Sequence, residues 1–342
     1  MHGGQLKGDH PYSPSLALHR YCLLNSGGLM KTRLEDPCHH DETTIRKRRG
    51  STAYRLALVG AVLALMAGCS PSGPTLTGPA AVYDKAKQAF AKGQLEDYNK
   101  ALDLLETLTS ADPPNDYTNR ARVLRAIICG GEMQGFKTLM EAYSTGADTT
   151  KVPSLKSEYA GLKRDTMRRA GELALEVGES TMRLTKGGAI PKDLTLEAPY
   201  PRVEPPGSVP VLNQVREGLK IGADDEALAA LDAPRAGVAD ALAEVVGGDR
   251  AQAKAKMSAG PVPLDSAAFA LFLAEKVMVG ALLYDKKHIY DPGKYKVLIG
   301  VADGAAQAAA AALQQTPDPE KTKRLKKLRD DIKAGLKASS QL

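Results

Sequence analysis

Residues 82–114 read VYDKAKQAFAKGQLEDYNKALDLLETLTSADPP, and the spacing of their apolar side chains predicts two helices joined by a short turn. The first helix would carry apolar residues at i, i+4, i+7 and i+8, namely Val82, Ala86, Ala89 and Phe90. Gly93 follows at a position where helices often end. The second helix would carry five such residues on one face: Tyr98, Ala101, Leu102, Leu105 and Leu108. Asp112-Pro113-Pro114 then ends the pattern, so a helical hairpin is expected.

The remainder of the chain repeats this pattern of paired helices. A second hairpin is expected with its turn at Gly130-Gly131, between helices that carry Leu124, Ile127 and Ile128 and then Phe136, Leu139, Met140 and Tyr143. A long helix is expected from Ser154 to about Leu184, and a further pair over 267–283 and 295–313. Aromatic residues make up only 5% of the chain and Trp is absent, a composition that favours helices. The predicted fold class is all-α.

The first hairpin contains three short motifs: Ala89-Phe90-Ala91-Lys92-Gly93, Ala101-Leu102-Asp103-Leu104-Leu105 and Ala111-Asp112-Pro113. Together these motifs resemble the tetratricopeptide repeat (TPR) family. The resemblance implies units of about 34 residues, each a helix-turn-helix that buries its apolar face by stacking on a neighbour. The implied architecture is a TPR-like α-solenoid built from degenerate helical hairpins.

A proline-rich stretch interrupts the helical pattern at residues 191–210. Its prolines, which include Pro199, Pro201, Pro205 and Pro206, oppose both a helix and a central strand. We expect a connector over 188–212 between two helical subdomains, 80–187 and 213–342. A loop that docks a partner or covers a groove is the alternative. The basic stretch at 319–342 is expected to form a terminal helix that closes the core.

The first 79 residues predict export. Arg46-Lys47-Arg48-Arg49 precede an apolar run over 56–67, and Gly68-Cys69-Ser70 follow, the order of segments in a secretory signal peptide. Only thirteen uncharged residues separate Arg55 from Cys69, whereas a membrane-spanning helix needs about 20. We therefore expect a non-native or disordered extension over 1–45, a signal peptide over 46–68 and a flexible tether over 69–79.

The stretch Met66-Ala67-Gly68-Cys69 resembles the lipobox of bacterial lipoproteins. This resemblance implies cleavage between Gly68 and Cys69 and attachment of lipid to the Cys69 sulfur. In that family Ser at the position of Ser70 goes with the outer membrane, so we expect a lipid-anchored envelope protein that faces the periplasm, at the outer membrane rather than the inner. Several acyl chains together give stable attachment. An uncleaved signal anchor with an incidental cysteine is the alternative.

Few residues after position 68 are suited to catalysis or metal binding. Cys69, Cys129 and His288 are the only cysteines and histidine there, so neither a metal site nor a cofactor is expected. The same part carries 37 Lys and Arg against 35 Asp and Glu, without the basic excess that nucleic-acid binding uses. Adjacent acids at 224–226 and 330–331 are expected to be helix starts and surface charges, because neighbours on a helix point in different directions.

The remaining polar and aromatic residues have ordinary structural interpretations. Cys129 follows two isoleucines and is expected to be buried, and His288 is expected at the surface of a turn. Three tyrosines near that turn fit either helix packing or a shallow recognition surface: Tyr284, Tyr290 and Tyr295. A basic run on the long helix fits either a solvated face or contact with anionic lipid: Lys163, Arg164, Arg168 and Arg169.

Three functions are compatible with these features. The best supported is an anchored interaction or scaffold module that binds a protein partner of the cell envelope through its helical-repeat surface. The second is an accessory small-molecule-binding component of a periplasmic transport system. The third is an enzyme that uses carboxylates alone, such as a cell-envelope hydrolase, which needs two acids about 5–9.5 Å apart in a cleft. No motif for other catalytic chemistry occurs after position 68, so a non-enzyme is expected.

Overall fold

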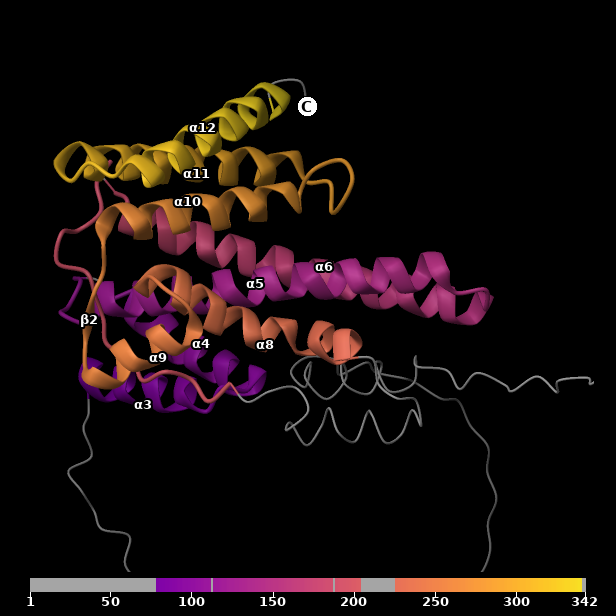
Figure 1. Cartoon of the computed structure of the whole chain (residues 1–342), viewed down its shortest axis with the longest axis horizontal. Helices are drawn as coiled ribbons and strands as arrows, with labels where there is room; N and C mark the ends of the chain where they lie inside the picture. The colour runs from indigo at the N-terminus through magenta and orange to yellow at the C-terminus, as the bar shows by residue number, and fades with distance from the viewer. Residues whose placement is uncertain (1–77, 112, 187, 204–224, 340–342) are drawn as a thin grey trace, which may run out of the picture. The chain divides into compact units, whose positions relative to one another are not determined.

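The computed structural model describes residues 78–339 except 112, 187 and 204–224, and leaves the side chains of 225–228 undescribed. This part is mostly helical (Figure 1), which confirms the all-α prediction. Its helices are α3 (Pro79–Ala91), α4 (Leu95–Thr109), α5 (Thr118–Thr149), α6 (Pro153–Leu184), α8 (Asp225–Val246), α9 (Arg250–Ala259), α10 (Ser266–Leu282), α11 (Pro292–Gln315) and α12 (Pro319–Ser339). Two short strands, β1 (Thr195–Leu196) and β2 (Val262–Pro263), pair antiparallel.

The first predicted hairpin is present as α3 and α4. Gly93, in the turn, has a φ of 72°, in the left-handed region that favours glycine. A Cβ at this position would lie 2.5 Å from the carbonyl oxygen of Arg202. The Arg202 N–H in turn donates to the carbonyl of Ala91 at 3.0 Å. Gly93 is therefore required both by the turn and by the segment that crosses it.

The turn predicted at Gly130-Gly131 is wrong, because α5 continues through it as one helix of 32 residues. Gly131 lies where α5 packs against α8, whereas Gly130 faces Phe272 and Lys276 of α10. A Cβ on Gly131 would lie 2.5 Å from the Cα of Val238, and one on Gly135 would lie 2.1 Å from the carbonyl oxygen of Ala233. Both distances are shorter than a van der Waals contact. These glycines thus allow neighbouring helices to pack closely. In the sequence, such glycines look the same as glycines that mark a turn.

The other predicted helices agree with the structure. The long helix expected from Ser154 to about Leu184 is α6, and α5 and α6 lie side by side as the longest pair (Figure 1). The pair expected over 267–283 and 295–313 is α10 and α11. Each begins with an aspartate that accepts a hydrogen bond from a backbone N–H of the first turn: Asp265 from Ala268 at 2.8 Å, and Asp291 from Lys294 at 3.1 Å.

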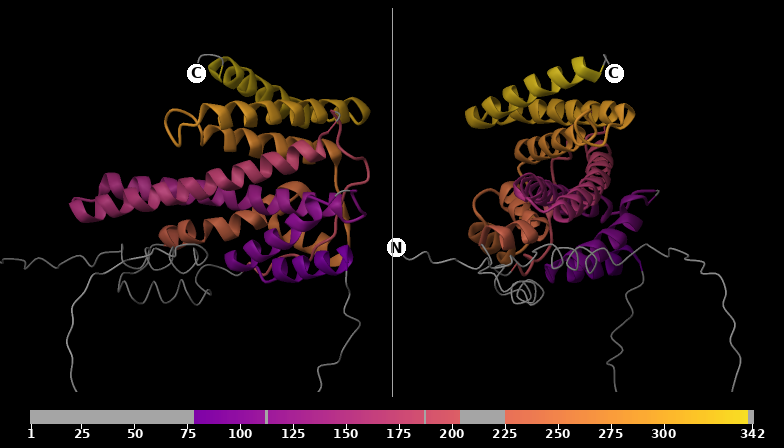
Figure 2. Two further views of the ribbon diagram at one scale, coloured as in Figure 1. Left: turned by 180° about the vertical axis from the view of Figure 1, so that it is seen from behind. Right: turned by 90° about the vertical axis from the view of Figure 1, so that its right-hand side faces the viewer.

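The helices pack in a succession of layers. α3 packs on α4, α4 on α5, α5 on both α6 and α8, α6 on α10, α10 on α11, and α11 on α12. Figures 1 and 2 show α3 and α12 at opposite ends of this succession in every view. The expected terminal helix is α12, which buries Leu325, Leu328 and Ile332. The stack thus places the first and last described helices far apart.

The described part of the proline-rich segment, 191–203, contains β1 and no helix. It is fastened to the helices through Glu197, whose carboxylate lies 3.1 Å from Lys87 of α3 and 2.5 Å from Arg120 of α5. The hydroxyl of Tyr83 donates to the Glu197 carbonyl at 3.2 Å. The predicted subdomain boundaries fall beside residue 187 and within 204–224, outside the described residues, so the division 80–187, 188–212 and 213–342 stays a prediction.

α11 is long and apolar enough to cross a membrane by length and composition alone. In the structure it packs against α6, α10 and α12 and buries nine residues in the core. A buried core helix passes the same test, and its packing supports that interpretation.

Candidate functional site

The residues predicted to carry the lipid lie outside the described part of the chain. These are Met66, Ala67, Gly68 and Cys69, together with the signal peptide and most of the tether. Lipid attachment at Cys69 and cleavage before it therefore stay predictions. The description begins at Gly78, and α3 starts one residue later.

A groove of about 790 Å³ lies between α10 and α12. α10 lines it with Met278, Val279 and Leu282, and α12 lines it with Leu328, Ala334 and Gly335. Tyr295 of α11, which is buried, also lines the groove. A Cβ on Gly335 would lie 2.8 Å from Ile299, so glycine lets α12 approach α11 closely at this point.

One end of the groove is closed by an ionic cluster. The Arg324 guanidinium of α12 donates hydrogen bonds to Glu275 of α10 and Glu244 of α8. Lys276 lies 3.0 Å from the same Glu244 carboxylate and 5.3 Å from the ring centroid of Phe272. The hydrogen bonds with Glu275, more than any other effect, raise the pKa of Arg324. These charges satisfy one another and fix the separation of α10 and α12 at this end.

The other end of the groove is apolar and open. Leu282, which lines the groove at the end of α10, is 42% exposed. Single exposed apolar side chains are common on protein surfaces, whereas apolar side chains grouped along a groove mark binding sites. Two charged residues also line the groove, Lys327 and Asp331, and neither forms an ion pair with another described residue.

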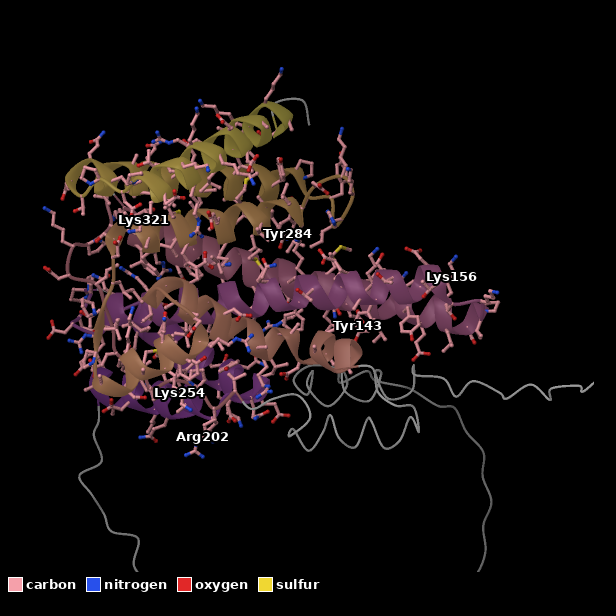
Figure 3. The ribbon with its side chains drawn as sticks, viewed as in Figure 1. Tyr143, Lys156, Arg202, Lys254, Tyr284 and Lys321 are labelled. Atoms are coloured by element: carbon pink, nitrogen blue, oxygen red, sulfur yellow. The ribbon has the colours of Figure 1, made fainter. Side chains whose placement is uncertain are left out.

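The helix that forms one wall is strongly basic. α12 contains eight Lys and Arg residues against Glu320, Asp330 and Asp331. Lys321, at its start, is neutralised by Asp265 and Asp318, each at 2.9 Å (Figure 3). Five other basic side chains on this helix form no ion pair with a described residue: Lys323, Lys326, Lys327, Arg329 and Lys333. Of these five residues only Lys327 lines the groove, where the acidic Asp331 also lies.

A second polar cluster lies between α4, α5 and α6 around the buried side chain of Arg125. The Arg125 side chain, 8% exposed, lies 2.6 Å from Glu106 and 3.5 Å from both Glu176 and Glu179. Cys129 is buried, as predicted, and its thiol donates to Glu176 at 3.3 Å. Burial raises the pKa of Cys129 well above its usual value, which keeps the sulfur protonated. This cluster holds helices together and offers no reactive thiolate.

Glu132 lies one turn further along α5 and is 1% exposed. Its Oε1 atom has no hydrogen-bond partner among the described residues. Burial raises the pKa of Glu132 from 4.5 to about 8, against the opposing effect of the Arg169 charge. The side chain is therefore a neutral carboxylic acid at neutral pH.

The residues around the turn between α10 and α11 mainly pack helices. Tyr284 is buried, and its hydroxyl donates to the Gly171 carbonyl of α6 at 2.8 Å (Figure 3). Tyr295 is also buried, and Tyr290 is 56% exposed. His288 is half-buried in this turn, with its Nδ1 atom 2.8 Å from Asp285. Packing rather than a shared recognition surface accounts for two of the three tyrosines.

The basic run on α6 is largely engaged with neighbouring side chains. Lys163 donates to Ser144 at 3.0 Å, and Arg169 donates to Asn99 of α4 at 2.8 Å. Arg168 lies 3.7 Å from Asp165 and is exposed. Lys163 and Arg169 thus bind side chains of neighbouring helices, which favours a structural role over contact with anionic lipid.

Two charged positions in the sequence weakly indicate the polar clusters. Glu275-Lys276 interrupts the apolar run of α10, and Glu132 lies in an apolar part of α5. A charged residue on the buried side of a helix requires a partner or a change of pKa. No group of three or more His, Cys, Asp or Glu residues that could hold a metal ion occurs within the described ranges.

Comparison with known proteins gives no match, either to a family model, to a curated protein sequence or to a solved structure.

Proposed function

We propose that this chain is a lipid-anchored protein of the bacterial cell envelope that binds a protein partner through the groove between α10 and α12. The observation that carries the proposal is the groove itself, with the exposed Leu282 among its apolar lining residues. The lipobox-like stretch ending at Cys69 supports the anchor. The proposed site is the periplasmic side of the outer membrane.

The position of the groove is consistent with anchoring through the N-terminal end. Pro79, the first residue of α3, follows Cys69 by ten residues, which reach at most about 35 Å when fully extended. α3 and α12 lie at opposite ends of the helix stack (Figure 2). A lipid on Cys69 would hold the α3 end near the bilayer and leave the groove accessible from the periplasm.

The repeat architecture belongs to the same proposal. α3 and α4 form the helix-turn-helix that carries the TPR-like motifs, and α10 and α11 form a second such pair. We propose that these pairs are degenerate repeats, and that α12 serves as the polar terminal helix that such stacks need. The basic outer face of α12 and its three buried apolar residues support this role.

One observation favours the second candidate function. A volume of about 790 Å³ falls within the range of about 300–1,000 Å³ typical of small-molecule sites. An accessory component that binds a small molecule for periplasmic transport would use the same groove. A small molecule that protects the exposed Leu282 from solvent without a bound protein would support this alternative.

The anchor is tested by Cys69→Ala. We expect this variant to lose metabolic labelling with a fatty acid and to accumulate as precursor, because the acceptor sulfur is gone. Cys129→Ala is the matched control, since that thiol is buried in the helical body and should not affect labelling. Labelling that persists in Cys69→Ala would contradict the anchor.

The interaction is tested by affinity purification from crosslinked envelopes. Leu282→Glu places a charge in the apolar end of the groove and should abolish recovery of the partner. Val297→Glu changes an even more exposed residue, 62% exposed, that does not line the groove, and should leave recovery intact. Equal recovery with both variants, or no reproducible partner with the wild-type chain, would rule out this function for the groove.

A further inference from the structure

We infer that the outer face of α12 is a docking surface for an anionic phospholipid bilayer. α12 packs on α11 and α10 as the last layer of the stack, so its outer side is turned away from these helices (Figures 1 and 2). The inference goes beyond the proposed function, because it concerns this outer side and not the occupant of the groove. Three features carry it: the placement of the lysines, the charge that remains after the ion pairs, and the composition of the face.

The lysines of α12 follow the period of the helix. At about 100° per residue, a single arc of about 120° contains five of them, which define the outer face: Lys323, Lys326, Lys327, Lys333 and Lys337. All five are exposed, and the arc contains one acid, Asp330. The buried apolar residues of the helix lie on the opposite side: Leu325, Leu328 and Ile332. The outer face therefore carries five positive charges against one negative charge.

Ion pairs within the described part of the chain do not neutralise this face. Four of its lysines form no ion pair with a described residue: Lys323, Lys326, Lys327 and Lys333. Elsewhere on the helix, by contrast, Lys321 and Arg324 are each bound by two carboxylates. Like charges three and four residues apart on a helix repel one another. A terminal helix needs a polar outer face, and a mixture of both signs would provide it without this repulsion. An anionic partner therefore explains the uniform charge better than solvation alone does.

The composition of the face favours a phosphate-rich surface over a folded protein. Protein interfaces usually contain apolar or aromatic anchors at their centre, whereas the arc contains one small apolar residue, Ala334, and no aromatic residue. Lysine carries a compact, hydrated charge on a flexible stem and does not need the fixed geometry that suits arginine. Clusters of about four to eight basic residues on one helix are typical of sites that bind anionic lipid headgroups.

The contact with the bilayer is electrostatic. A helix that inserts into a bilayer buries its apolar side at the boundary between headgroups and acyl chains. In α12 that side packs on α11 and α10, so the lysines meet the headgroups while Leu325, Leu328 and Ile332 stay within the protein. Binding should therefore depend on the charge of the lipid and on the salt concentration, without insertion.

The test measures capture of vesicles by the anchored chain. The purified lipidated chain is incorporated into immobilised vesicles of neutral phosphatidylcholine. Fluorescent vesicles are then added that are either neutral or contain about 30% phosphatidylglycerol. α3 and α12 lie at opposite ends of the stack (Figure 2), so a chain held through Cys69 presents α12 to the added vesicles. We expect capture of the anionic vesicles and no capture of the neutral ones. Raising the salt from about 0.1 M to about 1 M shortens the Debye length from about 10 Å to about 3 Å and should release the captured vesicles.

Matched lysine variants make the test specific. We expect Lys323→Gln, Lys326→Gln and Lys333→Gln together to weaken capture about a hundredfold, because each lysine near an anionic surface contributes about fivefold. None of these three residues lines the groove. The control removes the same charge from three exposed lysines of α3, α6 and α9, by Lys85→Gln, Lys156→Gln and Lys254→Gln. Figure 3 shows Lys156 and Lys254 away from α12. The control should change capture by less than about twofold, because charges beyond the Debye length are screened.

Equal losses in the two triple variants, or full capture by the α12 variant, would overturn the inference. Release of the vesicles by polyglutamate at a lower charge concentration than by added phosphatidylglycerol vesicles would also overturn it, because an acidic protein would then be the better partner. Retention of the chain on the neutral vesicles is measured separately and tests the proposed anchor. A chain that is not retained is instead sedimented with neutral and with anionic vesicles, so the outer face is tested whether or not the anchor is correct.

Discussion

The neutral state of buried Glu132 predicts a distinct dependence of stability on pH. The pKa of Glu132 rises from 4.5 to about 8 on folding, mainly because burial disfavours the charged carboxylate. The folded state therefore binds the proton more tightly than the unfolded state does. The contribution of Glu132 to folding is fully present below about pH 4.5 and is lost as the pH rises towards 8.

The size of the effect follows from the two pKa values. Each unit of difference corresponds to about 1.36 kcal/mol, so complete loss of the proton costs about 5 kcal/mol. Between pH 5 and pH 9 the loss amounts to about 4 kcal/mol, and most of it occurs below pH 8. Glu132→Gln keeps the shape of the side chain and removes the titration. We therefore expect the free energy of unfolding of Glu132→Gln, relative to wild type, to increase by about 4 kcal/mol over this range.

The assay is chemical denaturation of both proteins at pH 5, 7 and 9. Glu141→Gln is the control, because Glu141 lies on the same helix with its side chain 61% exposed and forms only a surface pair with Lys137. Its difference from wild type should stay nearly constant with pH. A constant difference for Glu132→Gln as well would show that Glu132 is ionised in the folded chain and would refute the reasoning.

Two further predictions concern helix packing. Gly135→Ala would place a Cβ 2.1 Å from a backbone carbonyl oxygen of α8, so we expect a loss of about 3 kcal/mol of stability in thermal unfolding. Gly304 lies at a helical position with no atom within 4 Å of an added Cβ, so Gly304→Ala should instead gain about 0.5–1 kcal/mol of stability. A loss of stability in this variant would contradict this account of the glycines. Arg125→Met removes the cation shared by three carboxylates and should cost about 3 kcal/mol in chemical denaturation, and a variant as stable as wild type would show that the cluster is not needed.

Sequence periodicity predicted the individual helices well. The pattern over 82–108 located α3 and α4, and the spacing over 154–184 located α6, because a buried face repeats with the period of the helix. Gly130-Gly131 misled the same reasoning. A glycine that ends a helix cannot be told in the sequence from a glycine that lets a neighbouring helix approach. Only the positions of α8 beside Gly131 and of α10 beside Gly130 distinguish them.

The candidate site, too, has one part that the sequence could predict and one part that it could not. The predicted lipid attachment depends on a local motif around Cys69, which a sequence can display completely. The groove depends on α10 and α12, whose facing residues are separated by some 50 positions in the chain. The basic residues of α12 were visible in the sequence, but the apolar slot beside them arises from the packing of three helices. Long-range pairs such as Arg324 with Glu275 could not be predicted from spacing.

The layered arrangement of the helices has a mechanical consequence. In a protein held at Cys69 and bound at α12, as proposed, any pull between membrane and partner passes through the helix interfaces in series. The contact of α3 with α4 bears this force first. The ion pairs of Glu197 with Lys87 and Arg120 connect α3 to α5 without passing through α4. The proline-rich segment that contains Glu197 then carries part of the force between α3 and α5, at the end of the stack nearest the anchor.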